Sequence, residues 1–128
     1  MSTLNATNIA DSSGNFPSNA SQIQQGRAKA WSNLNGQGTI APRDDFNISS
    51  YIDNGTGNYT NNFATAMVSA NFSPSGITTA STPGDGNTGI AQVGLGVQTS
   101  STVNYWTSFS SNSGQFDPNG VMNQINGD

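Results

Sequence analysis

Cysteine, histidine and glutamate are absent from the 128 residues. Without cysteine and histidine the chain has no disulfides, no thiol or imidazole for catalysis, and none of the usual zinc ligands. Paired carboxylates are the catalytic arrangement that remains possible, and only the seven aspartates could supply them. We expect Asp44 and Asp45 to precede the strand that Asp53 ends, roughly 25 Å away, too far for a dyad. The sequence therefore predicts no enzyme and no catalytic residues.

Charge is also scarce, at 8% of residues with a net charge of −4. Three cations, Arg27, Lys29 and Arg43, cannot form the basic stripe that a phosphate backbone needs, so nucleic acid is not an expected partner. A polar but nearly uncharged surface suits a protein held in an assembly, where neighbours would desolvate charges at high cost. Residues 85–89 place oxygen ligands like a calcium loop but lack its acidic count, so a turn is favoured. We expect no metal and no cofactor.

Long apolar runs are missing too. No stretch of 18 apolar residues occurs, and the first 14 residues contain no basic or apolar segment typical of a secretion signal. We therefore expect neither a membrane span nor export, and synthesis and folding in a cytoplasm.

What is present is a period-two pattern typical of β-strands. Alternation of apolar and polar residues predicts strands at 28–34, 46–52, 59–63, 70–72, 77–80, 91–97, 103–109 and 121–125. Residues 53–57 contain an Asn-Gly pair and predict a hairpin turn. The fold class is therefore all-β, an antiparallel β-sandwich or jelly-roll-like module, in a domain spanning residues 27–128.

Several positions within these strands carry specific expectations. Phe46, Ile48, Ser50 and Ile52 are predicted to share one face, and Pro74 is predicted to end a strand. The glycines at 94 and 96 suggest the close approach of another backbone or of an aromatic ring.

Residues 1–26 differ from the rest and predict an extended N-terminal attachment arm, with a short helical turn at 21–25. Four isolated apolar side chains are its candidate docking residues: Leu4, Ile9, Phe16 and Ile23. A floppy tail is the alternative that composition leaves open.

Three aromatic side chains are candidates for an interface or a glycan contact. Trp106 should face away from Val103, Tyr105 and Phe109, where it could anchor a subunit contact or stack on a sugar ring. Trp31 is ambiguous in the same way, and Tyr51 could contribute to a glycan site. The interface is the favoured interpretation.

Two runs carry a resemblance to a known family. Residues 27–50, beginning RAKAWSNLNGQGT, and residues 51–67, YIDNGTGNYTNNFATAM, resemble segments of phage tail-fibre and related virion proteins of marine and cyanobacterial phages. The second run is similar to a SITDNGTGDYTVNFTTAM-like hairpin over 17 successive positions. Asn61 departs from the family's usual valine on the strand face of Tyr59 and Phe63. Between residues 71 and 120 only the spacing of the predicted strands is similar to that of the family.

The resemblance implies a virion protein, often trimeric, with no catalytic residues. A tail fibre or tail-associated appendage module is the first hypothesis, with host attachment through its loops. A capsid decoration, or cement, protein is the alternative, and a carbohydrate-binding module is the third. The expected partners are other copies in a homotrimer, virion proteins of tail or capsid, and a host surface glycan. The expected location is the virion, assembled in the bacterial cytoplasm.

Overall fold

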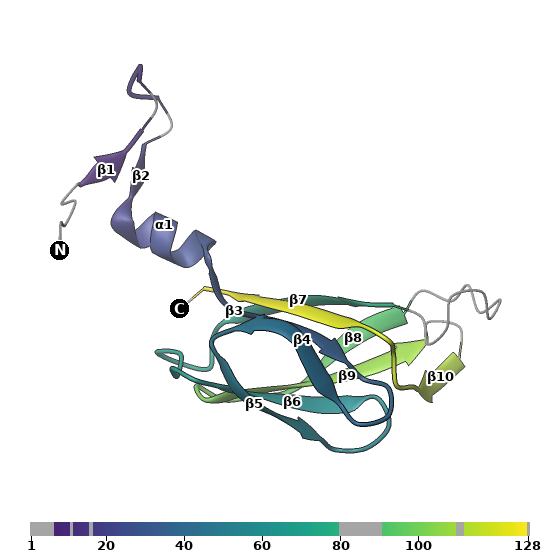
Figure 1. The fold of residues 1–128 in the computed structure, drawn as a ribbon. Helices are drawn as coiled ribbons and strands as arrows, with labels where there is room; N and C mark the ends of the chain where they lie inside the picture. The colour runs from purple at the N-terminus through teal and green to yellow at the C-terminus, as the bar shows by residue number, and fades with distance from the viewer. Residues whose placement is uncertain (1–6, 11, 16, 80–90, 110–111, 128) are drawn as a thin grey trace.

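A computed structural model describes residues 7–10, 12–15, 17–79, 91–109 and 112–127, with only the backbone at 91–94, 109, 112 and 113. Two antiparallel sheets pack face to face, and a smaller N-terminal segment stands away from them (Figure 1). The predicted all-β antiparallel sandwich is confirmed. The predicted calcium-like turn at 85–89 lies outside the described residues.

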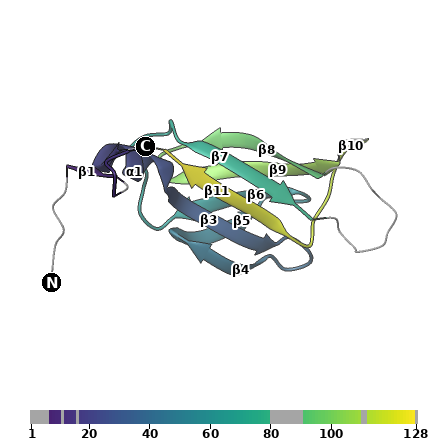
Figure 2. The ribbon, with the colours of Figure 1, turned by 90° about the horizontal axis from the view of Figure 1, so that it is seen from above.

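The four-stranded sheet has the order β4-β3-β11-β7 (Figure 2). Its strands are β3 (Ala28–Asn35), β4 (Ala41–Phe46), β7 (Ser73–Thr78) and β11 (Val121–Asn126). In the five-stranded sheet, β9 pairs with β8, β6 and β10, and β6 pairs with β5. These strands are β5 (Ile48–Asp53), β6 (Asn58–Phe63), β8 (Ala91–Gln98), β9 (Thr102–Phe109) and β10 (Asn112–Gln115).

The core follows from the alternation of inward residues on the central strands. In β3, β6 and β11 every second residue is buried, because successive side chains of a strand point to opposite faces. The apolar core forms two clusters, one of Ala30, Phe63, Met67, Phe72, Val103 and Ile125, the other of Leu34, Tyr59, Tyr105 and Val121.

The strand predicted over 46–52 is wrong, because β4 and β5 belong to different sheets. Asn47, with φ of 59°, turns the chain between them in a conformation that asparagine tolerates. Its Nδ2 donates to Lys29 O (3.1 Å), and its Oδ1 accepts from Thr65 N (2.7 Å). A bulge between Ile48 and Ser50 then changes which residues face inward. Ile52 is consequently 47% exposed, and Phe46, which lies beside Trp31 in the other sheet, is 52% exposed.

The turn at Asn47 also changes the predicted placement of the aspartates. Asp44 and Asp45 lie within β4 and do not precede the strand that Asp53 ends, which is β5. The prediction that Pro74 ends a strand is wrong as well, because it lies inside β7. As an edge strand, β7 tolerates a residue without an N–H group.

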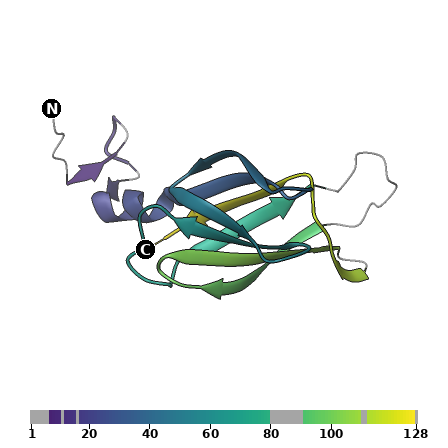
Figure 3. The same ribbon diagram turned by 60° about the horizontal axis from the view of Figure 1, so that its bottom comes forward.

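The N-terminal segment is a short ladder followed by a helix. Strands β1 (Asn8–Ile9) and β2 (Ser18–Asn19) pair, and α1 (Ala20–Gly26) follows. Asn19 and Gln22 form a capping box, with two hydrogen bonds of 2.9 Å between side chain and backbone. The predicted helical turn is therefore a seven-residue helix. In all three views this segment, the arm, projects from the sandwich (Figures 1, 2 and 3).

Two hydrogen bonds join the base of the arm to the end of β11. Asn126 Nδ2 donates to Gly26 O (3.2 Å), and Gly127 N donates to Gln25 O (3.3 Å). The turns at 36–40 and 54–57 lie at the opposite end of the sandwich (Figure 1). In the described part of the chain, α1 is too short and too polar to cross a membrane.

Candidate interaction surfaces

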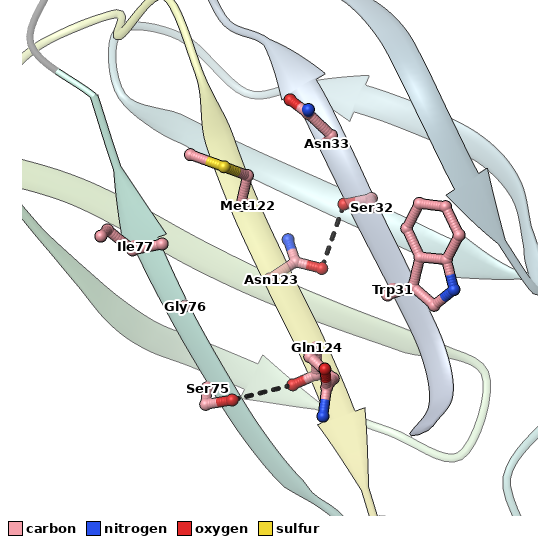
Figure 4. A pocket seen from close by; sticks show the side chains of 9 residues that line it. All are labelled: Trp31, Ser32, Asn33, Ser75, Gly76, Ile77, Met122, Asn123 and Gln124. Atoms are coloured by element: carbon pink, nitrogen blue, oxygen red, sulfur yellow. Dashed lines mark hydrogen bonds between the residues drawn. The ribbon is translucent and has the colours of Figure 1, made fainter. Parts of the chain in front are cut away.

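Trp31 lies on the outer face of the four-stranded sheet, beside an open groove of about 510 Å³ (Figure 4). Ladder pairing places Trp31 beside Phe46 and Gln124, and Met122 beside Asn33 and Ile77. Six outward side chains line the groove, and none is charged: Trp31, Asn33, Ser75, Ile77, Met122 and Gln124. Aromatic side chains and methionine, without charge, are typical of the centre of a protein interface.

Trp106 lies on the opposite side of the molecule, on the outer face of the five-stranded sheet. It pairs with Asn58 and Gly94 in the ladder and is partly exposed. A Cβ at Gly96 would come within 3.0 Å of Trp106 Nε1 and would overlap the Asn104 side chain. The close approach predicted from the glycines is thus confirmed at Gly96. Around Trp106 the face is polar, since Asn104 Nδ2 donates to Asn58 Oδ1 (2.7 Å) and Thr60 Oγ1 (3.0 Å).

Tyr51 lies on the inward side of β5, against the cluster around Leu34 and Tyr59. Its hydroxyl donates to Asp45 Oδ2 (3.0 Å) in the other sheet. Burial, together with this carboxylate, raises the pKa of Tyr51. The three candidate aromatics therefore lie in three separate places, and the structure does not bring them into one site.

On the arm, Ile9 and Ile23 line a common hollow of about 260 Å³ between β1, β2 and α1. They are 54% and 41% exposed. The other two candidate docking residues, Leu4 and Phe16, lie outside the described residues. The arm thus presents an apolar surface that its own sandwich does not cover.

No family model, no curated protein and no solved structure matches the chain.

A polar network inside the core was missed by the sequence analysis. Asn61 is fully buried, and its Oδ1 accepts from Tyr105 Oη (2.9 Å). Asn61 Nδ2 donates to Ser32 Oγ (3.0 Å), and Ser32 Oγ donates to Asn123 Oδ1 (3.0 Å). Ser32 and Asn123 belong to one sheet, and Asn61 and Tyr105 to the other. The only signal in the sequence was polar residues at inward positions of predicted strands.

A second polar contact closes the end of the sandwich opposite the arm. Asp117 Oδ1 accepts from Tyr59 Oη (2.8 Å) and from Gly57 N (2.7 Å). Nearby, Arg43 Nη2 donates to Asn119 Oδ1 (2.5 Å). Among the described residues no group of three potential metal ligands gathers here or elsewhere. We interpret these contacts as fixing the loops and the turn at 54–57 in one arrangement.

The tyrosines predict a pH dependence. Burial raises the pKa of Tyr59 and Tyr105, and Asp117 raises that of Tyr59 further. Above about pH 10 the unfolded chain loses these protons while the folded protein keeps them, so stability falls as pH rises. We expect each buried tyrosine to lower the free energy of unfolding by roughly 0.8 kcal/mol at pH 10.5 relative to pH 8, measured by urea unfolding.

The control for this prediction is Tyr59→Phe, which removes one titrating group. Its loss between the two pH values should be smaller than that of the unchanged protein. An equal loss in both proteins would contradict the assignment to Tyr59.

Proposed function

We propose that this chain is a non-enzymatic structural protein of a tailed-phage particle, a tail-associated appendage module attached by its arm and assembled in the bacterial cytoplasm. The observation that carries the proposal is the projecting arm with exposed Ile9 and Ile23. The nearly uncharged composition and the resemblance of residues 27–67 to phage virion proteins support it.

The secondary structure of the arm is too small to be stable alone, so in this proposal the arm needs a partner. A seven-residue helix is too short to be stable alone in water, and a two-residue ladder is weaker than an ordinary hairpin, itself marginal. The two exposed isoleucines would lose contact with water on docking, which favours association. In this proposal the arm binds the particle, and the turns at the opposite end face the host surface, where a glycan is the expected contact.

Capsid decoration is the second candidate, favoured by the same arm. An arm that reaches beyond its own sandwich could tie neighbouring capsid subunits together. Quantitative mass spectrometry of purified particles separates the two. A copy number of a few tens or fewer per particle supports the appendage and contradicts decoration. Hundreds of copies per particle support decoration and contradict the appendage. Absence from particles would contradict both.

The arm variants Ile9→Ser and Ile23→Ser test attachment in the full chain. Both side chains are on the arm and exposed, so the thermal midpoint should change by less than about 2 °C, while incorporation into particles falls at least about tenfold. Mass spectrometry of purified particles measures the incorporation.

Val68→Ser is the matched control, because Val68 is an 88% exposed apolar residue of the sandwich. It should be incorporated normally. If the arm variants are incorporated as well as Val68→Ser, the arm is not the attachment element.

The proposed homotrimer gives a further prediction. The outer face around Trp31 gathers Phe46, Ile77 and Met122, whereas Trp106 has polar neighbours, so we propose that the Trp31 face contacts another copy. Trp31→Ala should lower the mass measured by sedimentation from trimer toward monomer, because tryptophan at an interface centre often contributes about 2 kcal/mol or more.

Trp106→Ala is the comparison and should remain trimeric. The opposite result would assign the contact to the five-stranded sheet. A monomeric unchanged protein, in solution and in the particle, would contradict self-association altogether.

A further inference from the structure

The side chains of the buried network between the sheets form a chain in which each donates a hydrogen bond to the next. Tyr105 donates to Asn61, Asn61 donates to Ser32, and Ser32 donates to Asn123. The chain of donors therefore ends at Asn123, whose Oδ1 accepts from Ser32 and whose Nδ2 is the remaining donor (Figure 4). This atom is buried and has no hydrogen-bond partner among the described residues. Reversing the carboxamide would place two donors together, because Asn61 Nδ2 lies 3.4 Å from Asn123 Oδ1.

Asn123 also lines a cavity of about 80 Å³ between the sheets. The cavity lies where the edge strands β7 and β8 approach each other, with Pro74 and Leu95 on either side. Apolar walls come from Val103 and Ile125, and Tyr105 lines it too. A volume of this size accommodates about two or three water molecules.

We propose that this cavity is a binding site for ordered water, anchored by Asn123 Nδ2. An unsatisfied amide donor in the core is costly, whereas buried waters commonly satisfy such groups. A water that accepts from Asn123 Nδ2 has an acceptor within the same cavity lining, because the Tyr105 hydroxyl oxygen keeps acceptor capacity after donating to Asn61. The water would complete the polar network between the two sheets.

The inference can be tested on the unchanged full-length protein. Water-selective nuclear Overhauser spectroscopy should show a cross-peak from bound water to the Asn123 side-chain amide. The Thr107 backbone amide is an internal control, because Thr107 is fully buried, its N–H donates to Gly57 O (2.8 Å), and it does not line the cavity. A crystal structure at 1.5 Å resolution should show a water within about 3.2 Å of Asn123 Nδ2. An empty cavity with no Asn123 cross-peak would overturn the proposal.

A variant that fills the cavity gives an independent test, because it should shift the thermal midpoint in opposite directions for a hydrated and an empty cavity. Val103→Ile adds one methylene to a buried residue of the cavity lining. In a dry apolar void this filling should raise the thermal midpoint, whereas in a wet cavity it displaces water from Asn123 and should lower it. Val121→Ile, equally buried but outside the lining, measures the cost of overpacking alone. A midpoint above that of the unchanged protein would overturn the proposal, and one below that of Val121→Ile would support it.

Discussion

Replacing Asn61 by alanine is expected to lower the free energy of unfolding by about 3 kcal/mol. The substitution leaves the Tyr105 hydroxyl without its acceptor and Ser32 Oγ without its donor, both in the core. It also leaves a cavity where a fully buried side chain stood. Urea unfolding followed by tryptophan fluorescence measures the loss.

Asn62→Ala is the matched control, because the neighbouring asparagine points outward and donates to Ser50 Oγ (2.9 Å) at the surface. It should cost less than about 1 kcal/mol. Making the whole network apolar, with Ser32→Ala, Asn61→Val, Tyr105→Phe and Asn123→Val together, should recover most of the Asn61→Ala loss, since no donor or acceptor of these four side chains is then stranded. Equal losses for Asn61→Ala and Asn62→Ala would contradict a structural role for the network.

Gly57→Ala is the second substitution with a large expected effect, a loss of about 3 kcal/mol or more. Gly57 has φ of 65°, which costs other residues roughly 1 kcal/mol. A Cβ there would also lie 2.8 Å from Phe116 O and 2.9 Å from Thr107 O. Both are backbone atoms. Phe116 O accepts from Thr107 Oγ1 (2.6 Å), and the Thr107 backbone is tied to Gly57 because Thr107 N donates to Gly57 O (2.8 Å).

Gly38→Ala separates the two contributions. Gly38 has almost the same φ, 64°, but a Cβ there would meet nothing within 4 Å. This variant should therefore lose only about 1 kcal/mol. If the two alanine variants prove equally stable, backbone conformation alone accounts for Gly57, and the crowding against Thr107 and Phe116 has no effect.

The strand pattern was predictable wherever alternation runs without interruption. The inward residues of β3 and β6 follow directly from period two. The pattern failed at Asn47, because a single residue with positive φ sends the chain to the other sheet while apolar residues continue on both sides. A bulge that begins one residue later then places Tyr51 against the core and leaves Ile52, which was predicted to face inward with Phe46, exposed.

The polar network could not be predicted for a different reason. Asn61 is a polar residue at an inward position of its strand, and the sequence gives no indication of what lies opposite. Its partners Ser32, Tyr105 and Asn123 come from three other strands, so the compensation becomes visible only once both sheets are assembled. The separation of Trp31 from Trp106 likewise depends on which sheet each strand joins.

The central position of β11 has a consequence for the order of events during synthesis. This strand lies between β3 and β7 and pairs with both, yet residues 36–120 separate it from β3. On the ribosome β3 can pair early with β4, but one of its edges must remain open until β11 emerges. Closure of so long a loop makes assembly of this sheet a late step. Until residues 121–126 have emerged, the nascent chain therefore exposes an unpaired edge of β3, with which another nascent copy could pair.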